Sequence, residues 1–280
     1  MKHFETKWKA HDGVEIFGQG WEPDAGSPKA VICLVHGLGE HSSRYAHVAE
    51  AFTREGYALF TSDLRGHGRS AGARGHINSI EDFMKDIDSL FQQTRERYPG
   101  LPTILYGHSL GGILVLHYTL KRKPAVEGVI ATSPGLHNEL ENQPVKVMAA
   151  KILGAVIPAV AIPSGLDPKS ISRDPKVVDA YVNDPLVHDR ISLGFGREML
   201  GVNKWTLEHA SEFPAPLLLL HGKADSLAFS SSSAEFADAL KGRDCTISLW
   251  DGGYHELHND LEQAEVFKTM ITWMDACLKG

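Results

Sequence analysis

Apolar and polar residues are grouped along the chain in blocks that predict strands and helices in regular alternation. Short, almost wholly apolar blocks predict buried strands at residues 30–37, 57–63, 101–107, 126–134, 215–222 and 246–250. Segments whose apolar residues recur with the helical period predict helices at 47–56, from Ser79 onward, at 110–123, at 232–242 and at 260–278. Strands that alternate with helices are typical of βαβ units. We therefore expect an α/β fold with a mostly parallel central sheet and helices on both faces.

Two parts of the chain depart from this alternation. Residues 4–22 predict a hairpin of two short strands with its turn at His11-Asp12-Gly13. From about residue 135 to residue 213 the pattern is lost, and this part is rich in proline, glycine and helix-like pieces. An interruption within a regular series indicates an insertion. We therefore expect a core built from residues 1–134 and 214–280 and a cap subdomain built from residues 135–213.

The composition is that of an ordinary soluble globule, since 42% of the 280 residues are hydrophobic and 22% are charged. The net charge of −7 excludes nucleic acid as the main partner, because phosphate binding requires a basic face. The three cysteines form no C-x-x-C pair, which favours a reducing compartment. The N-terminal segment has no apolar signal core, and no run of about 18 apolar residues occurs. We therefore expect a cytoplasmic protein.

The motif YGHSLGG, residues 106–112, puts a serine at the junction of a predicted strand and a predicted helix. Gly107 and Gly111 lie two residues before and two residues after Ser109, and such small neighbours permit a sharp turn that exposes the serine hydroxyl. The helix that follows directs its N-terminal N–H groups toward charge that develops beside the serine. We therefore predict that Ser109 is a nucleophile.

A serine nucleophile requires a base, and the base requires an acid that orients it. In this type of fold the chain order is serine, acid, histidine, and Asp225 follows the predicted strand 215–222 as the candidate acid. Only His255 and His258 come after it. His255 is the candidate base, because the two glycines before it free the backbone to point the ring back at the serine. Asp251 is the alternative acid, but it is too close to His255 in sequence to orient the ring easily.

An acyl-transfer intermediate also requires backbone N–H donors for its oxyanion. The first expected donor is the N–H of Leu110, the residue after the nucleophile. The second is the N–H of Leu38, in the loop HGLG (36–39), whose glycines allow the backbone to approach the substrate oxygen. These two amides complete a candidate serine-hydrolase site.

The chain carries no motif for a metal or a cofactor. The segment HELH, residues 255–258, is one residue short of the zinc-binding pattern H-E-x-x-H, so the two rings would not share a helix face. No phosphate-binding loop and no G-x-G-x-x-G after a strand occur. We expect neither a metal nor a cofactor.

Six segments together resemble the monoacylglycerol lipase and lysophospholipase group of α/β-hydrolases. They are HGLGEHSSRY (36–45), DLRGHGRS (63–70), GHSLGG (107–112), SRDPKVVDAYVNDPLV (172–187), HGKAD (221–225) and GGYHELHND (252–260). The resemblance runs over nearly the whole chain and implies the α/β-hydrolase fold. The other motifs are shared by α/β-hydrolases in general, and the stretches GEHSSRY and YVNDPL are what make the resemblance specific to this group.

The resemblance also implies how a glycerol head group is held. By analogy with the family the glycerol is bound by Glu40, Arg44, Tyr181 and His258, and a diol offers two donors and two acceptors to such a set. The alternative is that Glu40 and Arg44 form an ion pair that only braces their loop. One departure concerns the segment SLAFSSSS after Asp225, where the family has a charged or proline-bearing turn. We expect the loop beside Asp225 to differ in shape.

The inserted segment contains an unusually apolar stretch, VMAAKILGAVIPAVAI, residues 147–162. Its apolar residues within a few helical turns are Val147, Met148, Ile152, Leu153, Val156 and Ile157. We interpret the stretch as part of a lid that lines an acyl tunnel and makes transient contact with membrane or micelle surfaces. The alternative is a helix that merely packs on the core.

These features predict a serine hydrolase that cleaves carboxylic esters through an acyl-enzyme, with a small lipid ester as its partner. The resemblance implies monoacylglycerols as substrates and glycerol and fatty acid as products. The alternatives are a lysophospholipase, a general carboxylesterase, an acyltransferase, an S33-type peptidase and a non-catalytic ligand receptor. An acyltransferase would use the H-x-x-x-x-D formed by His255 and Asp260, but we interpret Asp260 as the cap of the last helix. A peptidase requires an acidic cluster for the substrate amine, which the sequence does not locate.

Overall fold

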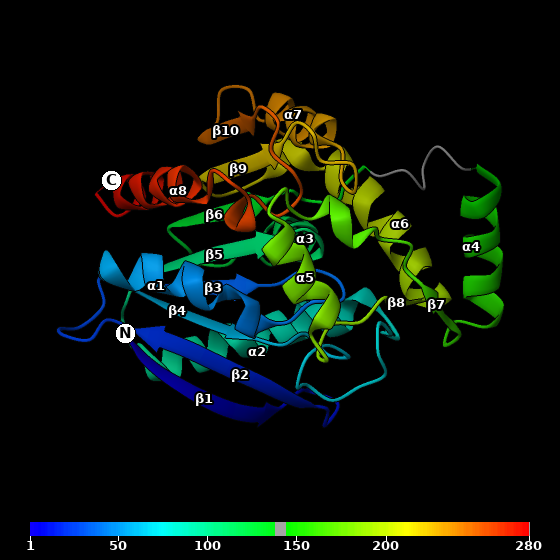
Figure 1. Ribbon diagram of the computed structural model, residues 1–280, viewed down its shortest axis with the longest axis horizontal. Helices are drawn as coiled ribbons and strands as arrows, with labels where there is room; N and C mark the ends of the chain where they lie inside the picture. The colour runs from blue at the N-terminus through cyan, green and yellow to red at the C-terminus, as the bar shows by residue number, and fades with distance from the viewer. Residues whose placement is uncertain (138–143, 280) are drawn as a thin grey trace.

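The central sheet has eight strands in the order β1-β2-β4-β3-β5-β6-β9-β10 (Figure 1). The computed structural model describes residues 1–137 and 144–279. The strands are β1 Lys2–Lys9, β2 Glu15–Glu22, β3 Ala30–Val35, β4 Tyr57–Ser62, β5 Thr103–His108, β6 Gly128–Thr132, β9 Leu217–Gly222 and β10 Cys245–Trp250. All neighbours from β4 to β10 are parallel, whereas β2 pairs antiparallel with both β1 and β4. The expected mostly parallel sheet and the expected N-terminal hairpin are therefore confirmed.

Five helices accompany the sheet: α1 Ala46–Arg54, α2 Ile80–Arg97, α3 Leu110–Arg122, α7 Ser230–Ala239 and α8 Gln263–Cys277. Ser79 caps α2, as expected, by accepting a hydrogen bond from the Glu81 amide at 3.2 Å. The last helix begins at Gln263 rather than at 260, and the interpretation of Asp260 as its cap is wrong. The Asp260 carboxylate instead accepts hydrogen bonds from the amides of Arg173 and Tyr254.

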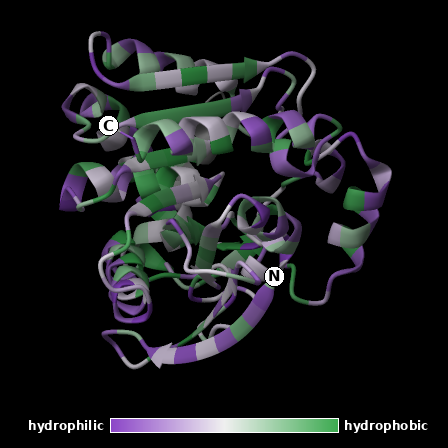
Figure 2. Cartoon of the chain, turned by 90° about the vertical axis from the view of Figure 1, so that its left-hand side faces the viewer, coloured by the Kyte–Doolittle hydropathy of each residue, from purple (hydrophilic) through white to green (hydrophobic). Residues whose placement is uncertain are grey.

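The helices form one layer on each face of the sheet, because successive strand residues point to opposite sides. In β3, Val31 and Cys33 belong to the core beneath α2, α3 and α7, whereas Ile32 and Leu34 belong to the core beneath α1 and α8. These strand residues are fully buried. Figure 2 shows the central strands in hydrophobic green, while the edge strand β1 alternates in colour. The two-sided burial explains why the sequence of the parallel strands is apolar throughout.

The segment predicted as an insertion contains α4 Pro144–Val156, β7 Ala161–Pro163, α5 Pro175–Asn183, β8 Arg190–Ser192 and α6 Leu193–Glu208. It lies beyond the carboxyl ends of β5 and β9 in Figure 1. Helix α6 anchors this segment to the core, since its residues Phe195 and Val202 are buried among the hydrophobic core residues of the sheet. Helix α4 packs on α6, where Gly154 approaches the Leu193 carbonyl too closely for any side chain. The division into core and cap at residues 135 and 213 stays a prediction.

None of the helices within the described part of the chain is both long enough and apolar enough to cross a membrane.

Candidate active site

Ser109 lies between β5 and α3 in a backbone conformation that ordinary residues avoid, with φ 54° and ψ −114°. The neighbouring glycines make this turn possible by close approach. A Cβ on Gly107 would lie 2.2 Å from the Gly111 carbonyl oxygen, and one on Gly111 would lie 1.9 Å from the Val35 carbonyl oxygen. The G-x-S-x-G spacing therefore follows from the packing of a sharp strand-to-helix turn. The turn leaves the Ser109 hydroxyl half-buried at the carboxyl end of the sheet.

The structure brings the three residues predicted as a catalytic triad into one hydrogen-bonded line. His255 Nε2 is 2.8 Å from Ser109 Oγ, and His255 Nδ1 is 2.7 Å from Asp225 Oδ2. They come from the loops after β5, β9 and β10, which end at the same edge of the sheet. With Asp225 ionised, Nδ1 donates to the carboxylate and Nε2 accepts from the serine hydroxyl. This arrangement can deprotonate Ser109 for attack on a carbonyl carbon.

The loop after Asp225 supplies backbone donors to the carboxylate. Asp225 Oδ1 accepts hydrogen bonds from the amides of Leu227 at 2.8 Å and Ala228 at 3.0 Å. Burial opposes the charge, but His255 and His221 outweigh it and hold the pKa of Asp225 below its usual value. The segment SLAF, which departs from the family pattern, thus provides donors through its main chain. The alternative acid Asp251 is exposed and pairs with the Lys223 ammonium at 2.7 Å.

The electrostatic environment suits His255 as a base. Burial disfavours its imidazolium, but the adjacent Asp225 carboxylate outweighs burial and raises the pKa of His255 above 6.5. The neighbouring His108 ring, 4.9 Å away, bonds to the Thr132 hydroxyl, and burial lowers the pKa of His108 to about 4. His108 is therefore uncharged near neutral pH and does not oppose a charge on His255.

The two expected oxyanion donors are the amides of Leu110 and Leu38. Leu110 is the first residue of α3, and Leu38 lines the same cavity as Ser109. Neither amide donates a hydrogen bond to an acceptor within residues 1–137 and 144–279. The loop of Leu38 is held in place by Glu40, whose carboxylate accepts from the Gly37 amide at 2.6 Å. Both amides are thus available to a substrate oxygen, while their role as donors stays a prediction.

A buried ion-pair group forms the polar end of the cavity. The Arg44 guanidinium binds Glu40 through Nη1 at 2.7 Å and binds both carboxylate oxygens of Glu256, each at 2.7 Å. The ring of Tyr181 from α5 stacks on this guanidinium at 4.7 Å. Glu40, Tyr181 and Glu256 line the cavity beside Ser109, and Arg44 lies behind them. The structure therefore brings three of the four residues implied for glycerol binding into one group.

Glu256 belongs to this group although the sequence analysis did not select it. It follows His255 directly and is buried. The segment HELH contains this glutamate, but the zinc pattern was the only role considered for the segment as a whole. Its role depends on Arg44, which is 212 positions away in sequence and adjacent only in the fold.

His258, the fourth residue implied for glycerol binding, does not line the cavity. It is fully buried and packs between the Tyr45 ring at 4.9 Å and the His108 ring at 4.7 Å. Its ring nitrogens have no hydrogen-bond partner in the part of the chain that the structure describes. Burial holds the pKa of His258 well below its usual value, so the ring is neutral. The packing of its ring against Tyr45 and His108, rather than its spacing from His255 in the sequence, places it away from the cavity.

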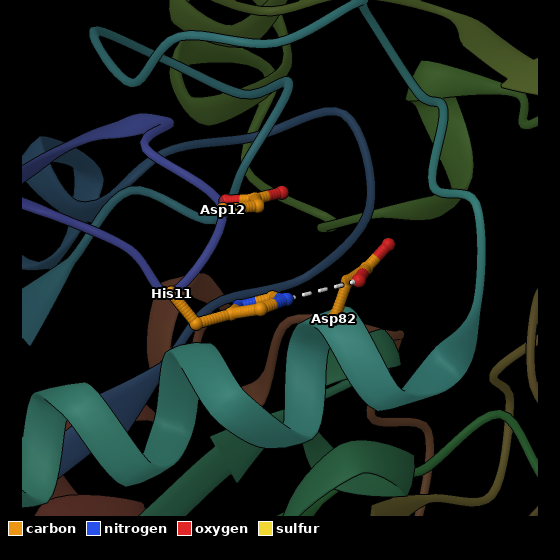
Figure 3. Close-up of side chains that lie close together, drawn as sticks. All are labelled: His11, Asp12 and Asp82. Carbon is orange, nitrogen blue, oxygen red and sulfur yellow. Dashed lines mark ion pairs between the residues drawn. The ribbon is translucent and has the colours of Figure 1, made fainter.

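One cluster elsewhere contains potential metal ligands. His11 and Asp12 of the hairpin turn face Asp82 of α2, and His11 Nε2 is 3.6 Å from an Asp82 oxygen (Figure 3). The Arg65 guanidinium already pairs with Asp12 at 2.7 Å and lies 3.8 Å from Asp82. A cation there would meet an arginine, so the cluster is better described as an ion-pair network that fastens the hairpin to α2.

Comparisons with known proteins show what the whole chain is similar to. The family model described as serine aminopeptidase, S33, matches residues 26–262. The monoacylglycerol lipase of Mycolicibacterium smegmatis is 35% identical over 94% of this chain and 93% of its own length. An uncharacterised abhydrolase domain-containing protein of Dictyostelium discoideum is 40% identical, but the chain spans only 27% of that protein. The crystal structure of Paleococcus ferrophilus monoacylglycerol lipase matches with a TM-score of 0.84 at 35% identity, covering 99% of this chain and all of the other.

Proposed function

The chain belongs to the serine aminopeptidase S33 family of α/β-hydrolases, and from this premise we propose that it hydrolyses monoacylglycerols to glycerol and fatty acid. The observation that carries the proposal is the hydrogen-bonded line from Asp225 through His255 to Ser109, which ends at a cavity with a polar, buried end. Relatives named monoacylglycerol lipases match nearly the whole chain and supply the substrate class.

In the proposed reaction Ser109 Oγ attacks the ester carbonyl carbon while His255 Nε2 takes the hydroxyl proton. The amides of Leu38 and Leu110 hold the oxyanion of the tetrahedral intermediate. The ester C–O bond then breaks, and the glycerol oxygen takes the proton from His255. Water attacks the acyl-enzyme by the same route, with His255 again as the base. The fatty acid leaves when Ser109 Oγ regains its proton.

The glycerol is held at the polar end of the cavity. Glu40 and Tyr181 line it and offer a carboxylate acceptor and a phenol, while Arg44 holds the two groups in position. His258 acts in this proposal only as packing behind His108. A loop-bracing role of Glu40 is compatible with glycerol binding, because a carboxylate offers about four acceptor sites. Oε1 accepts from the Gly37 amide and the Tyr45 hydroxyl, and Oε2 accepts from Arg44, which leaves Oε2 a site for a glycerol hydroxyl.

The family's name also raises the peptidase alternative. An aminopeptidase needs an uncommitted carboxylate to bind the substrate amine. Of the three carboxylates that line the cavity, Glu40 and Glu256 are already bound by Arg44 at 2.7 Å, and Asp167 is exposed, so water screens its charge. The acyltransferase alternative is weakened as well, since Asp260 is buried and bound to Arg173. The site therefore favours ester hydrolysis.

The cap supplies the contact with lipid. Met148, Ile152 and Val156 of α4 are 58%, 56% and 73% exposed, which is unusual for large apolar side chains on one helix. In our proposal this face rests transiently on a membrane or micelle that contains the substrate.

The direct test is the release of glycerol from a monoacylglycerol by pure protein. We expect the wild type to be active and Ser109→Ala to be inactive with an unchanged circular dichroism spectrum, because the residue is small and only half-buried. Ser89→Ala on the outer helix α2 is the matched control and should retain full activity. A fluorophosphonate probe should label Ser109 alone. Labelling at another serine, or activity in Ser109→Ala, would contradict the assignment.

A further inference from the structure

The cavity beside Ser109 has an imbalance of charge. Glu40, Asp167 and Glu256 line it, and among the described lining residues there is no lysine or arginine. Asp167 is exposed at the rim, where it precedes a short 3-10 helix, η3 Pro168–Ser170. Arg44, which binds Glu40 and Glu256, is not among the residues that line the cavity. Any head group that enters the cavity therefore meets carboxylates first.

The buried group does not neutralise itself, because two carboxylates share one guanidinium. The side chains of Glu40, Glu256 and Arg44 are only 3%, 4% and 10% exposed, so water screens the remaining negative charge weakly. Burial opposes ionisation of Glu40, but Arg44 outweighs it and lowers the pKa of Glu40 to about 2. Arg44 contacts both oxygens of Glu256 in the two-pronged geometry of a guanidinium–carboxylate pair.

The other titratable groups around the cavity do not compensate this charge. Burial lowers the pKa of His108 and of His258, so both rings are neutral near pH 7. Burial raises the pKa of Tyr181, which keeps its phenol uncharged. His255 must be neutral to act as a base, and its positive charge during reaction is matched by Asp225. One negative charge is left over within the buried group.

We propose that Glu256 is a specificity-determining residue, whose excess negative charge admits neutral polyol esters and excludes esters with an anionic head group. The proposal rests on the proposed function, because the neutral ester admitted is the monoacylglycerol. Glu40 alone would balance Arg44 and leave the polar end of the cavity uncharged. Glu256 adds the charge that a phosphate or carboxylate on the head group would have to approach in a poorly screened site.

The test compares a 1-monoacylglycerol with the 3-phosphate of the same monoacylglycerol, both in micelles of one uncharged detergent. We expect Glu256→Gln to raise the ratio of kcat/KM for the anionic ester to kcat/KM for the neutral ester by about 10-fold, the scale of a single charge in a partly screened site. The ratio is insensitive to a general loss of activity. Glu256→Asp keeps the charge and should leave the ratio unchanged, even where both rates fall.

Two further variants keep the result decisive. The Asp251 carboxylate is 89% exposed and is not among the residues that line the cavity. Asp251→Asn changes the net charge by the same amount as Glu256→Gln and should not change the ratio. Asp167→Asn preserves the turn at the rim and should raise the ratio by about 2- to 3-fold, since an exposed charge is screened. This second variant gives the answer if Glu256→Gln does not fold.

The inference is overturned if the ratio is the same in wild type and in the folded variants, or if Asp251→Asn moves it as much as Glu256→Gln. Failure of the proposed function is a separate outcome, in which wild type leaves the monoacylglycerol intact. In that case protection of Ser109 from fluorophosphonate labelling by glycerol 3-phosphate, relative to glycerol, replaces the rate ratio. Stronger relative protection in Glu256→Gln than in wild type supports the charge selection, and equal protection refutes it.

Discussion

Ser109 and its partners show how much of this site is determined by single residues. The positive φ of Ser109 is tolerated because glycines at 107 and 111 let three backbone segments meet without side chains. His255 is likewise shaped by one neighbour, since the Asp225 carboxylate outweighs burial and raises the pKa of His255. Removing the Asp225 carboxylate should change the chemistry without changing the fold, whereas a side chain at Gly107 or Gly111 would displace the backbone.

The first prediction at this scale concerns pH. His255 must be neutral to accept the Ser109 proton, so kcat/KM should fall as the pH drops through the pKa of His255, which Asp225 raises from its ordinary value. Asp225→Asn removes the carboxylate, moves this acidic limb to lower pH and lowers kcat by about 10⁴-fold. The measurement is hydrolysis of a p-nitrophenyl ester between about pH 5 and pH 9. Asp251→Asn is the control, and a larger effect there would show that the acid is misassigned.

A second residue-scale prediction separates glycerol binding by Glu40 from loop bracing. If Glu40 holds the glycerol, Glu40→Gln should lower kcat/KM for a monoacylglycerol by about 10- to 100-fold, the scale of one lost hydrogen bond to a charged group. The methyl ester of the same fatty acid has no free hydroxyl and should be nearly unaffected. Equal losses on both esters would mean that the side chain acts by holding the Gly37 amide, and thus the loop of Leu38.

At the scale of elements, the segment predicted as an insertion holds the loop that carries the base. The Arg173 side chain pairs with Asp260 at 2.9 Å, and the same carboxylate accepts a hydrogen bond from the amide of Tyr254, directly before His255. Directly after His255, the Glu256 amide donates to the Ile171 carbonyl at 2.8 Å. The segment before α5 and the loop after β10 are therefore joined on both sides of the catalytic candidate.

This junction predicts that Arg173 positions His255. Arg173→Gln should lower kcat by about 10-fold for monoacylglycerol and p-nitrophenyl ester alike, with little change in KM, because the base is displaced and the head-group end is intact. Arg173→Lys should recover part of the rate. Arg69→Gln, which breaks an exposed ion pair with Glu5, is the matched control and should be silent. A change confined to KM would contradict a positioning role.

At the scale of the whole molecule, the apolar face of α4 stands apart from the core that buries most large apolar side chains. Figure 1 shows α4 at the margin of the molecule beyond α6. It packs on α6, and Met148, Ile152, Leu153 and Val156 of α4 are exposed. None of the described residues of α4 is among those that line the cavity beside Ser109. An exposed apolar helix face nevertheless suits a protein that takes its substrate from a lipid surface.

The corresponding prediction compares lipid binding with soluble turnover. The double substitution Ile152→Ser and Val156→Ser should reduce co-flotation with phosphatidylcholine vesicles about 10-fold or more, because it removes two exposed apolar side chains from the interface. Hydrolysis of water-soluble p-nitrophenyl acetate should stay within about twofold of wild type. Val182→Ser, on α5 and 61% exposed, is a control for loss of apolar surface elsewhere. Undiminished flotation would show that α4 does not contact the lipid.

The sequence by itself determined the elements and the residues that depend on local spacing. Strand and helix periodicity was sufficient to predict the alternation of strands and helices. The glycines around Ser109 and the chain order of Ser109, Asp225 and His255 were sufficient to predict which residues the fold brings together, because a strand end, a sharp turn and a loop glycine are short-range features. The segment SLAF departs from the family pattern in its side chains, but its backbone amides still donate to Asp225, since backbone donors do not depend on side-chain identity.

The tertiary structure alone decided the contacts between distant segments. Glu256 joins Arg44 across 212 positions, and Asp260 binds Arg173 across 87 positions instead of capping a helix. His258, three residues after His255, turns away from the cavity and packs behind His108. A buried charge or ring takes the partner that the packed core brings to it, because leaving it unpaired costs free energy, and neither periodicity nor motif spacing encodes that choice.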